Sequence, residues 1–288
     1  MFTVSFNLIM AAFRGWWADR ALSLGAAIAF YTVFSLAPML LAIIAVAGLV
    51  FGREAAQGAI VAQIGGLIGV KEAEAIQAMI ASASDFGSGV LGITIGIITF
   101  LLVATGAFVE LQDDLNLIWK AKPSEASGVV FFIKSRLLSL AMLAAIGFLL
   151  LVSLSVDAAL SAVSSYLNET LPLASVVLQA LNFFFALTVA TFFFAVIFKF
   201  LPDVPIAWRD TWVGAFVTAA LFTSGKFLIG LYLGRSGVAS SYGAAASIIT
   251  ILLWVYYSSQ ILLFGAEFTK AYSERHGSRA KHDSGGSD

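Results

Sequence analysis

Long, uninterrupted blocks of apolar residues constrain this chain more than any other feature. Hydrophobic residues make up 60% of its 288 residues and charged residues only 11%, whereas an ordinary soluble domain is about 25% charged. Because a bilayer core offers no water to an unpaired backbone, each block is expected to be a helix. The sequence therefore predicts an all-α, polytopic integral membrane protein.

Six of these blocks are long enough to cross a bilayer, which takes about 20 apolar residues. We expect these spans at roughly 21–51, 89–109, 137–160, 173–200, 211–233 and 243–270. Pro38 lies near the middle of the first span and predicts a kink there.

Polar and amphipathic segments surround the spans. The apolar segment 2–17 contains the pair Trp16–Trp17 and predicts an interfacial helix. Segment 52–87 mixes polar and apolar residues at helical spacing, which predicts one or two amphipathic helices on the outer side. We expect residues 1–272 to form a single membrane domain and the polar tail 273–288 to be disordered.

The distribution of Lys and Arg predicts the orientation of the chain. If the N-terminus is cytoplasmic, the inner segments hold 12 basic residues and the outer ones only 3. Basic residues concentrate in cytoplasmic loops. We therefore expect both termini in the cytoplasm. The outer basic residues are Arg53, Lys71 and Arg235.

Several functional classes find no support in the residue inventory. The chain has no cysteine, and both histidines, His276 and His282, lie in the tail, so we expect no metal site and no cofactor. No GxxxxGK[ST] pattern is present, so transport is expected to proceed without nucleotide hydrolysis. A net charge of −1 argues against a nucleic-acid partner. We expect a protein that is not an enzyme.

Lys226 lies inside the fifth expected span, toward its outer half. A charge at depth in a membrane is costly and usually faces a bundle interior or a wet cavity. Lys226 is therefore a candidate anionic-ligand or gating residue. A lysine that snorkels to the outer interface, or that pairs with an acid on another helix, explains the same position.

An acidic cluster marks the inner end of the second span. Glu110, Asp113 and Asp114 share one helical face. They form a candidate cation or proton site. The simpler interpretation is that they pair with nearby Arg209, Lys120 or Arg20.

Three polar residues share one face of the sixth span: Glu267, Gln260 and Tyr256. Such a face needs partners or water, so it predicts a hydrated cavity or interhelical hydrogen bonds. Tyr31 and Ser35 of the first span are the expected opposing lining.

Charged residues at the inner face also suggest an ionic latch. Asp19 and Arg20 begin the first span, and a second group flanks the turn between the fourth and fifth spans. The latch either closes an inner gate or only stabilises the fold. Its members are Asp19, Arg20, Asp113, Asp114, Asp203 and Arg209.

Four stretches together resemble the YihY/BrkB family of bacterial inner-membrane proteins. They cover residues 19–41, 104–119, 201–234 and 242–272, the last reading YGAAASIITILLWVYYSSQILLFGAEFTKAY. The resemblance implies a six-span protein of the bacterial inner (plasma) membrane. The family has been labelled a virulence factor and ribonuclease BN. The ribonuclease label is unsupported here, because neither convergent metal ligands nor an RNA-binding groove is visible.

Two functional hypotheses remain. The first is a transporter or translocator built as a gated or alternating helix bundle, with lipids or other amphiphiles as the substrate class, since no span is polar enough for an open aqueous channel. The second is a structural or partner-binding protein of the cell envelope. Membrane lipids are the expected partners in either case, and a homo-oligomer or an envelope protein partner stays open.

Overall fold

The computed structural model of the chain is all-helical over the residues that it describes. These are residues 2–83, 102–121, 136–142, 144–145, 147–149, 152, 172–235 and 245–280. The helices are α1 (Phe2–Ala18), α2 (Ala21–Phe51), α3 (Arg53–Ile68), α4 (Val70–Ala83), α6 (Gly106–Ile118), α8 (Pro172–Phe200), α9 (Trp208–Arg235) and α11 (Ala246–Arg275). A shorter apolar helix covers Arg136–Leu149.

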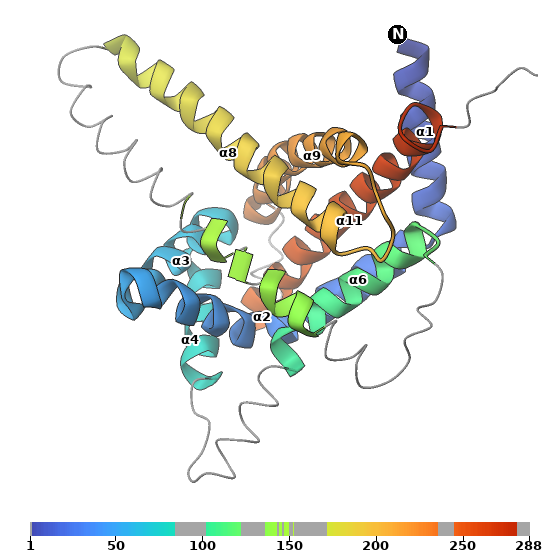
Figure 1. Cartoon of the computed structure of the whole chain (residues 1–288). Coiled ribbons are helices and arrows are strands. Elements are labelled where there is room, and N and C mark those ends of the chain that lie inside the picture. Colours follow the sequence, from blue (N-terminus) through green and yellow to red (C-terminus); the bar gives the residue numbers. More distant parts are fainter. Residues whose placement is uncertain are drawn as a thin grey trace, which may run out of the picture.

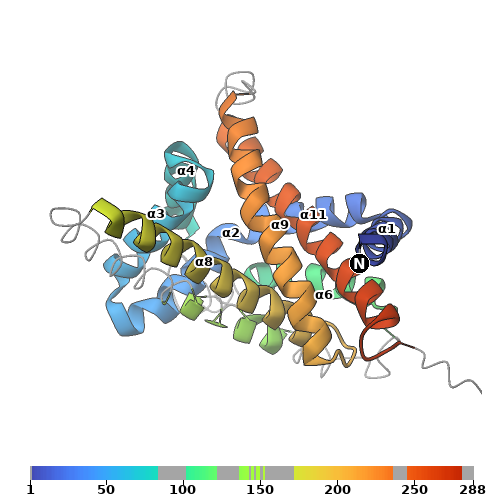
Figure 2. The same ribbon diagram turned by 90° about the horizontal axis from the view of Figure 1, so that it is seen from above.

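Helix α11 is the centre of the arrangement. It packs against α2, α9 and α1, and α8 packs against the other side of α9 (Figures 1 and 2). The main hydrophobic core draws on α2, α6, α8, α9 and α11, including Ile43, Leu115, Phe198 and Leu263. A separate cluster of Leu8, Ala12, Phe268 and Ala271 joins α1 to α11.

Glycine and threonine side by side let α9 and α11 approach closely. A Cβ on Gly214 of α9 would collide with Thr269 of α11, and a Cβ on Gly265 of α11 would collide with Thr218 of α9. Each threonine hydroxyl donates a 2.7 Å hydrogen bond to the carbonyl four residues earlier in its own helix. The crossing therefore buries two hydroxyls without leaving either unpaired, as close helix contacts in membranes require.

Three helices of the described chain are long and apolar enough to cross a membrane. They run over Ala21–Leu49, Ala180–Phe200 and Ala246–Arg275. These correspond to the first, fourth and sixth expected spans, and the fifth falls within α9. The expected spans over 89–109 and 137–160 lie largely outside the described residues. The total of six therefore stays a prediction.

The segment expected to form one or two outer amphipathic helices forms two, α3 and α4. Gly52 (φ 83°) and Gly69 (φ 110°) lie at the two bends, in backbone conformations that L side chains rarely adopt. The pair packs on α2 and lies at the opposite side of the molecule from α1 (Figures 1 and 2).

The structure differs from the expected start of the disordered tail at residue 273. Helix α11 continues to Arg275, and the residues up to 280 fold back onto the start of α9. The reason is a set of hydrogen bonds to Asp210, described below. Residues 281–288 lie outside the described part of the chain.

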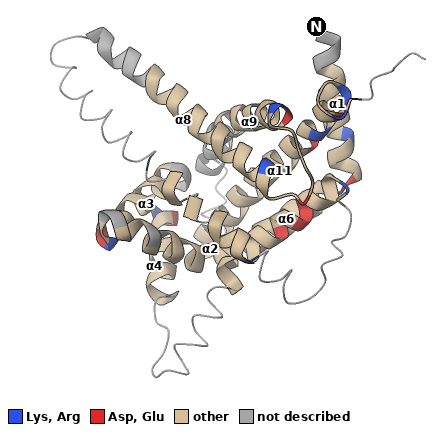
Figure 3. Ribbon diagram, in the orientation of Figure 1, with Lys and Arg blue, Asp and Glu red and all other residues tan. Residues whose placement is uncertain are grey.

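Charged residues gather at one end of the helix bundle. They cluster around α6, the start of α9, the end of α11 and α1, while the middles of the long helices are nearly free of charge (Figure 3). The described parts of several expected inner segments thus lie at the same end, and the orientation of this end in the membrane stays a prediction. A second, smaller group of charges lies on α3 and α4.

Candidate functional site

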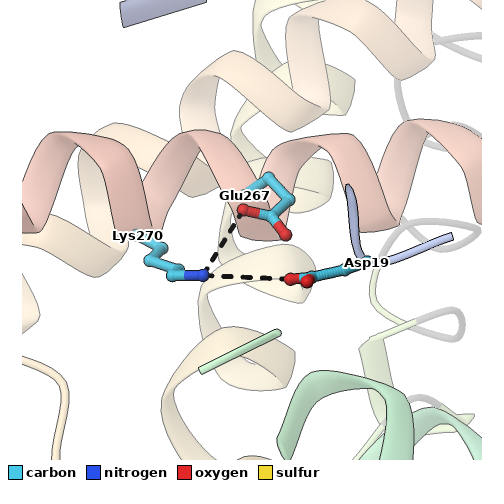
Figure 4. Close-up of polar contacts among 3 residues, drawn as sticks. All are labelled: Asp19, Glu267 and Lys270. Atoms are coloured by element: carbon cyan, nitrogen blue, oxygen red, sulfur yellow. Dashed lines mark ion pairs between the residues drawn. The ribbon is translucent and has the colours of Figure 1, made fainter. Parts of the chain in front are cut away.

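The most unusual polar site in the described chain is a buried cluster of two acids and one lysine. Lys270 Nζ lies 3.8 Å from Glu267 Oε2 and 3.9 Å from Asp19 Oδ2 (Figure 4). The side chain of Glu267 is 3% exposed, that of Lys270 14% and that of Asp19 21%. We call these three residues the acid–lysine cluster.

The end of α1 brings Asp19 to this position. Helix α1 stops at Ala18, and Arg20 adopts a left-handed conformation (φ 56°), which starts α2 in a new direction. This bend is the elbow between α1 and α2. One turn earlier, Gly15 lies so close to the Glu267 carboxylate that a Cβ would collide with it. The missing side chain lets the α1 backbone cover the acid.

The acid–lysine cluster has more acceptors than donors. Glu267 Oε1 and Asp19 Oδ2 are buried and have no hydrogen-bond partner in the described chain. Buried polar atoms are nearly always paired, and an exception calls for an explanation. With one ammonium for two carboxylates, the cluster is a site for a cation, a proton or a moving gate.

Gln260 lies two turns before Glu267 and also contacts the start of α2. Its Nε2 donates to the Ala21 carbonyl oxygen at 3.2 Å, and a Cβ on Gly25 would collide with the same amide. The Gln260 Oε1 atom is buried and has no donor among the residues that the structure describes. Interhelical hydrogen bonding, one of the two expectations for this face, is therefore present at Gln260.

Tyr31 and Ser35, the expected lining opposite the polar face that includes Glu267, contact the start of α6, and their place in that lining stays a prediction. Both lie against Gly106 at the start of α6, where a Cβ would be 3.4 Å from Ser35 Oγ. Ser35 is buried, whereas Tyr31 is 44% exposed. Helix α1, absent from the predicted lining, covers Glu267.

A hollow of about 250 Å³ lies at the elbow. Its walls carry two indoles, one guanidinium and one hydroxyl, from Trp16, Trp17, Arg20, Ala21, Leu22 and Ser23. The Trp16 Nε1 atom is buried, and no acceptor for it is found in the described chain. Trp17 and Arg20 are exposed, so the hollow opens to the surroundings.

The acidic residues of α6 form a second site. Asp203, from the turn after α8, accepts hydrogen bonds from Asn116 Nδ2 (2.8 Å) and Gln112 Nε2 (3.3 Å). Asp203 thus joins Glu110, Asp113 and Asp114 on α6. No ion pair to Arg209, Lys120 or Arg20 is found among the described residues, so the expected neutralisation is not observed there.

Burial and the closeness of these carboxylates to one another raise the pKa values of three of them. Burial, together with the negative charges of Glu110 and Asp113, raises the pKa of Asp114 to about 7. Burial and Asp113 raise the pKa of Glu110, and burial and Asp203 raise that of Asp113. Asp114 Oδ2 is buried, and no partner for it is found in the described part of the chain. Asp114 is therefore the acid of this cluster that we expect to take up a proton near neutral pH.

The expected ionic latch is divided into separate networks. Asp19 pairs with Lys270, while Asp203 bonds to α6. Asp210, which is fully buried, accepts hydrogen bonds from Ser273 Oγ (2.8 Å) and from Ser278 Oγ (2.6 Å) and N–H (3.0 Å). Arg20 and Arg209 are exposed. Sequence spacing gave no signal for the partners Lys270, Ser273 and Ser278, because they depend on how the helices cross.

Lys226 lies on the exposed surface of α9. No ion pair to an acid is found for it in the described chain, so the expectation of a locking pair finds no support there. Its role in gating or in anion binding stays a prediction. The described residues also contain no group of three or more His, Cys, Asp or Glu able to hold a metal ion.

Comparison with known proteins identifies relatives of most of the chain. The model of the family described as virulence factor BrkB matches residues 12–286. A UPF0761 membrane protein of Legionella pneumophila is 29% identical over 182 residues, which cover 63% of this chain and 42% of that protein. The UPF0761 membrane protein YihY of Shigella boydii is 29% identical over 186 residues, covering 63% of this chain and 60% of YihY.

The match extends over only part of these relatives. A UPF0761 membrane protein of Ralstonia nicotianae, 27% identical over 186 residues, is covered over 40% of its length. The relatives' names describe membrane proteins and state no reaction. No solved structure matches the chain.

Proposed function

The chain belongs to the virulence factor BrkB family of membrane proteins, and from this premise we propose that it translocates lipids or other amphiphiles across the bacterial inner membrane. Membership confirms the resemblance to the YihY/BrkB family that the four stretches indicated. The proposal includes six spans, both termini in the cytoplasm and a gated or alternating bundle that hydrolyses no nucleotide.

The observation that carries the proposal is the buried carboxyl of Glu267. It lies in Ala246–Arg275, one of the helices able to cross a membrane, and one of its oxygens has no partner among the described residues. Ionisable groups inside membrane proteins are costly and commonly mark substrate or ion pathways. A group that served only to hold helices together would be expected to have all its hydrogen bonds satisfied.

The hollow at the elbow supports an amphiphile as the substrate. Indoles are typical of the membrane–water interface, and Arg20 supplies the cation that a phosphate prefers. The apolar residues exposed on α1 and α2 next to this hollow suit acyl chains: Phe13, Trp17 and Leu22. Lys226 on α9 would attract the same headgroup in the outer half of the membrane.

Reconstitution of the full chain into liposomes tests the proposal. One leaflet carries fluorescent phosphatidylglycerol, and in parallel vesicles it carries fluorescent phosphatidylcholine. We expect wild-type protein to move the anionic lipid faster than empty vesicles do, and Arg20→Gln or Lys226→Met to slow this movement several-fold. The matched control is Arg53→Gln, which removes an exposed cation from the α3–α4 pair.

The alternative function, a structural or partner-binding envelope protein, makes a different forecast. Labelled lipid would then move no faster than in empty vesicles with either headgroup, although the protein is folded in the vesicle. That outcome would overturn the translocator.

A further inference from the structure

The acid–lysine cluster has an unbalanced charge in a setting that disfavours it. One ammonium, Lys270, serves two carboxylates at 3.8 and 3.9 Å. With all three groups ionised the cluster carries a net −1. Burying an uncompensated charge is expensive, and real sites take up a proton or a counter-ion instead.

The neighbouring elements do not supply the missing positive charge. In the described chain, the charged groups that act on Glu267 are Asp19, Lys270 and Glu274, and Glu274 adds a further negative charge. From α1 and the elbow, Arg14 and Arg20 are exposed. The nearest cation on α9 is Arg209, also exposed, and α2 brings no charged residue.

The two acids converge on one ammonium. An oxygen of Glu267 lies 3.8 Å from Lys270 Nζ and an oxygen of Asp19 lies 3.9 Å from it, and both carboxylates face this ammonium (Figure 4). Ionised carboxylates are acceptors only, so one of these acids can donate to the other only when it carries a proton. No donor in the described chain reaches Glu267 Oε1 or Asp19 Oδ2.

We propose that Asp19 and Glu267 together bind one exchangeable proton, and that this proton couples substrate movement to the proton gradient. The coupling rests on the proposed function, whereas proton binding does not. With the proton bound, one acid is neutral and donates a hydrogen bond to the other, whose negative charge compensates that of the Lys270 ammonium. Without it, the proton has passed to water and the cluster carries a net charge of −1.

Helix α1, which covers Glu267, links the two protonation states to a movement. At Gly15 the α1 backbone lies directly against the Glu267 carboxylate. When the proton leaves, the surplus charge attracts water, and water enters only if α1 moves away from α11. This movement would shift the elbow, which also forms the hollow assigned to the headgroup.

Infrared difference spectroscopy on the purified full chain in detergent tests proton binding directly. Asp114 should give a protonated carboxyl band of its own near neutral pH, so the titration uses Asp114→Asn as the parent protein, which should still show a protonated carboxyl band that disappears as the pH rises. We expect Asp19→Asn and Glu267→Gln, each added to this parent, to remove the band, because the two residues share one proton. Glu274→Gln, which neutralises an exposed acid on the same helix, should keep the band. If the band is lost in only one of the two variants, or in neither, Asp19 and Glu267 do not share a proton.

A second measurement needs no variant and separates a proton from a sodium ion. We expect the thermal stability of the wild-type protein to be unchanged by sodium at constant pH. Stabilisation by sodium at constant pH would overturn the proton assignment. A shared carboxyl band without lipid movement would refute the proposed lipid translocation but not the shared proton. Lipid movement without the band would refute the shared proton but not the lipid translocation.

Discussion

Gly15 of α1 lies directly against the carboxylate of Glu267 in α11, with no space for a Cβ between them. The contact joins a helix that lies outside the expected spans to a buried acid of a helix long and apolar enough to cross a membrane. We expect Gly15→Ala to push α1 off the acid–lysine cluster and to lower the stability by about 1–3 kcal/mol, as overpacking does. Thermal unfolding in detergent measures this.

The matched control for that substitution is Gly58→Ala in α3, where a Cβ meets open space. There the gain in helix propensity should stabilise the protein slightly, by up to about 1 kcal/mol. Equal effects of the two substitutions would mean that α1 does not rest on Glu267.

The α9–α11 crossing gives a second prediction. We expect Gly265→Ala to destabilise the protein because the added methyl group meets Thr218, at a cost of about 1–3 kcal/mol. Gly66→Ala, on the exposed face of α3, is the control. If Gly265→Ala unfolds at the same temperature as the wild type, the close contact between α9 and α11 at this position is contradicted.

Much of this fold could be predicted from the sequence, because hydropathy and length depend on each helix alone. The ranges expected for the first, fourth and sixth spans agree with α2, α8 and α11 to within a few residues. The site was harder to predict. Asp19 meets Lys270 and Ser35 meets Gly106 because of how α1 and α6 lie against other helices, and no periodicity within one segment encodes that.

The polar segment after α11 shows the same limit of prediction from sequence. A polar segment rich in Gly and Ser is typical of disorder, yet Ser278 and Arg279 fold back onto the start of α9. Asp210 has no exposed surface and gains three hydrogen bonds from Ser273 and Ser278. A buried acid that needs donors therefore determines where the tail begins.

Asp210 should stabilise the protein in a pH-dependent way. Burial alone would raise its pKa, but the hydrogen bonds from Ser278 and Ser273 outweigh burial and lower it. A lowered folded-state pKa gives stability that is present above the unfolded value, about 3.9, and is lost as the pH falls through the folded value. We expect Asp210→Asn to cost on the order of 2 kcal/mol at neutral pH, and less as the solution is acidified.

Unfolding measured across pH checks this, with Glu54→Gln on exposed α3 as the control. A deficit of Asp210→Asn that grows toward acidic pH would contradict the assignment. Limited proteolysis should also cut the tail of Asp210→Asn faster than that of the wild type.

Asp114 should behave in the opposite sense. Its pKa is raised to about 7, first by burial and then by Glu110 and Asp113, so the folded state holds a proton that the unfolded chain releases near pH 4. Stability is therefore highest below that value and declines as the pH rises toward 7. We expect Asp114→Asn to be more stable than wild type at pH 8, and this advantage to vanish at acidic pH.

The control for Asp114 is Glu74→Gln, an exposed acid of α4, which should show no such crossover. If wild-type protein and Asp114→Asn keep the same difference in stability from pH 4 to pH 8, Asp114 is ionised throughout and the acidic cluster takes up no proton near neutrality.

The measurement that tests the central claim most directly is movement of labelled phosphatidylglycerol in liposomes that contain wild-type protein, Glu267→Gln or Glu274→Gln. Both variants remove one acid from α11, but only Glu267 is buried in the acid–lysine cluster. We expect wild type and Glu274→Gln to move lipid at similar rates and to respond to an imposed pH gradient, and Glu267→Gln to lose at least tenfold, about 1.4 kcal/mol in the barrier. Equal rates for all three proteins would contradict a role for the buried acid in translocation.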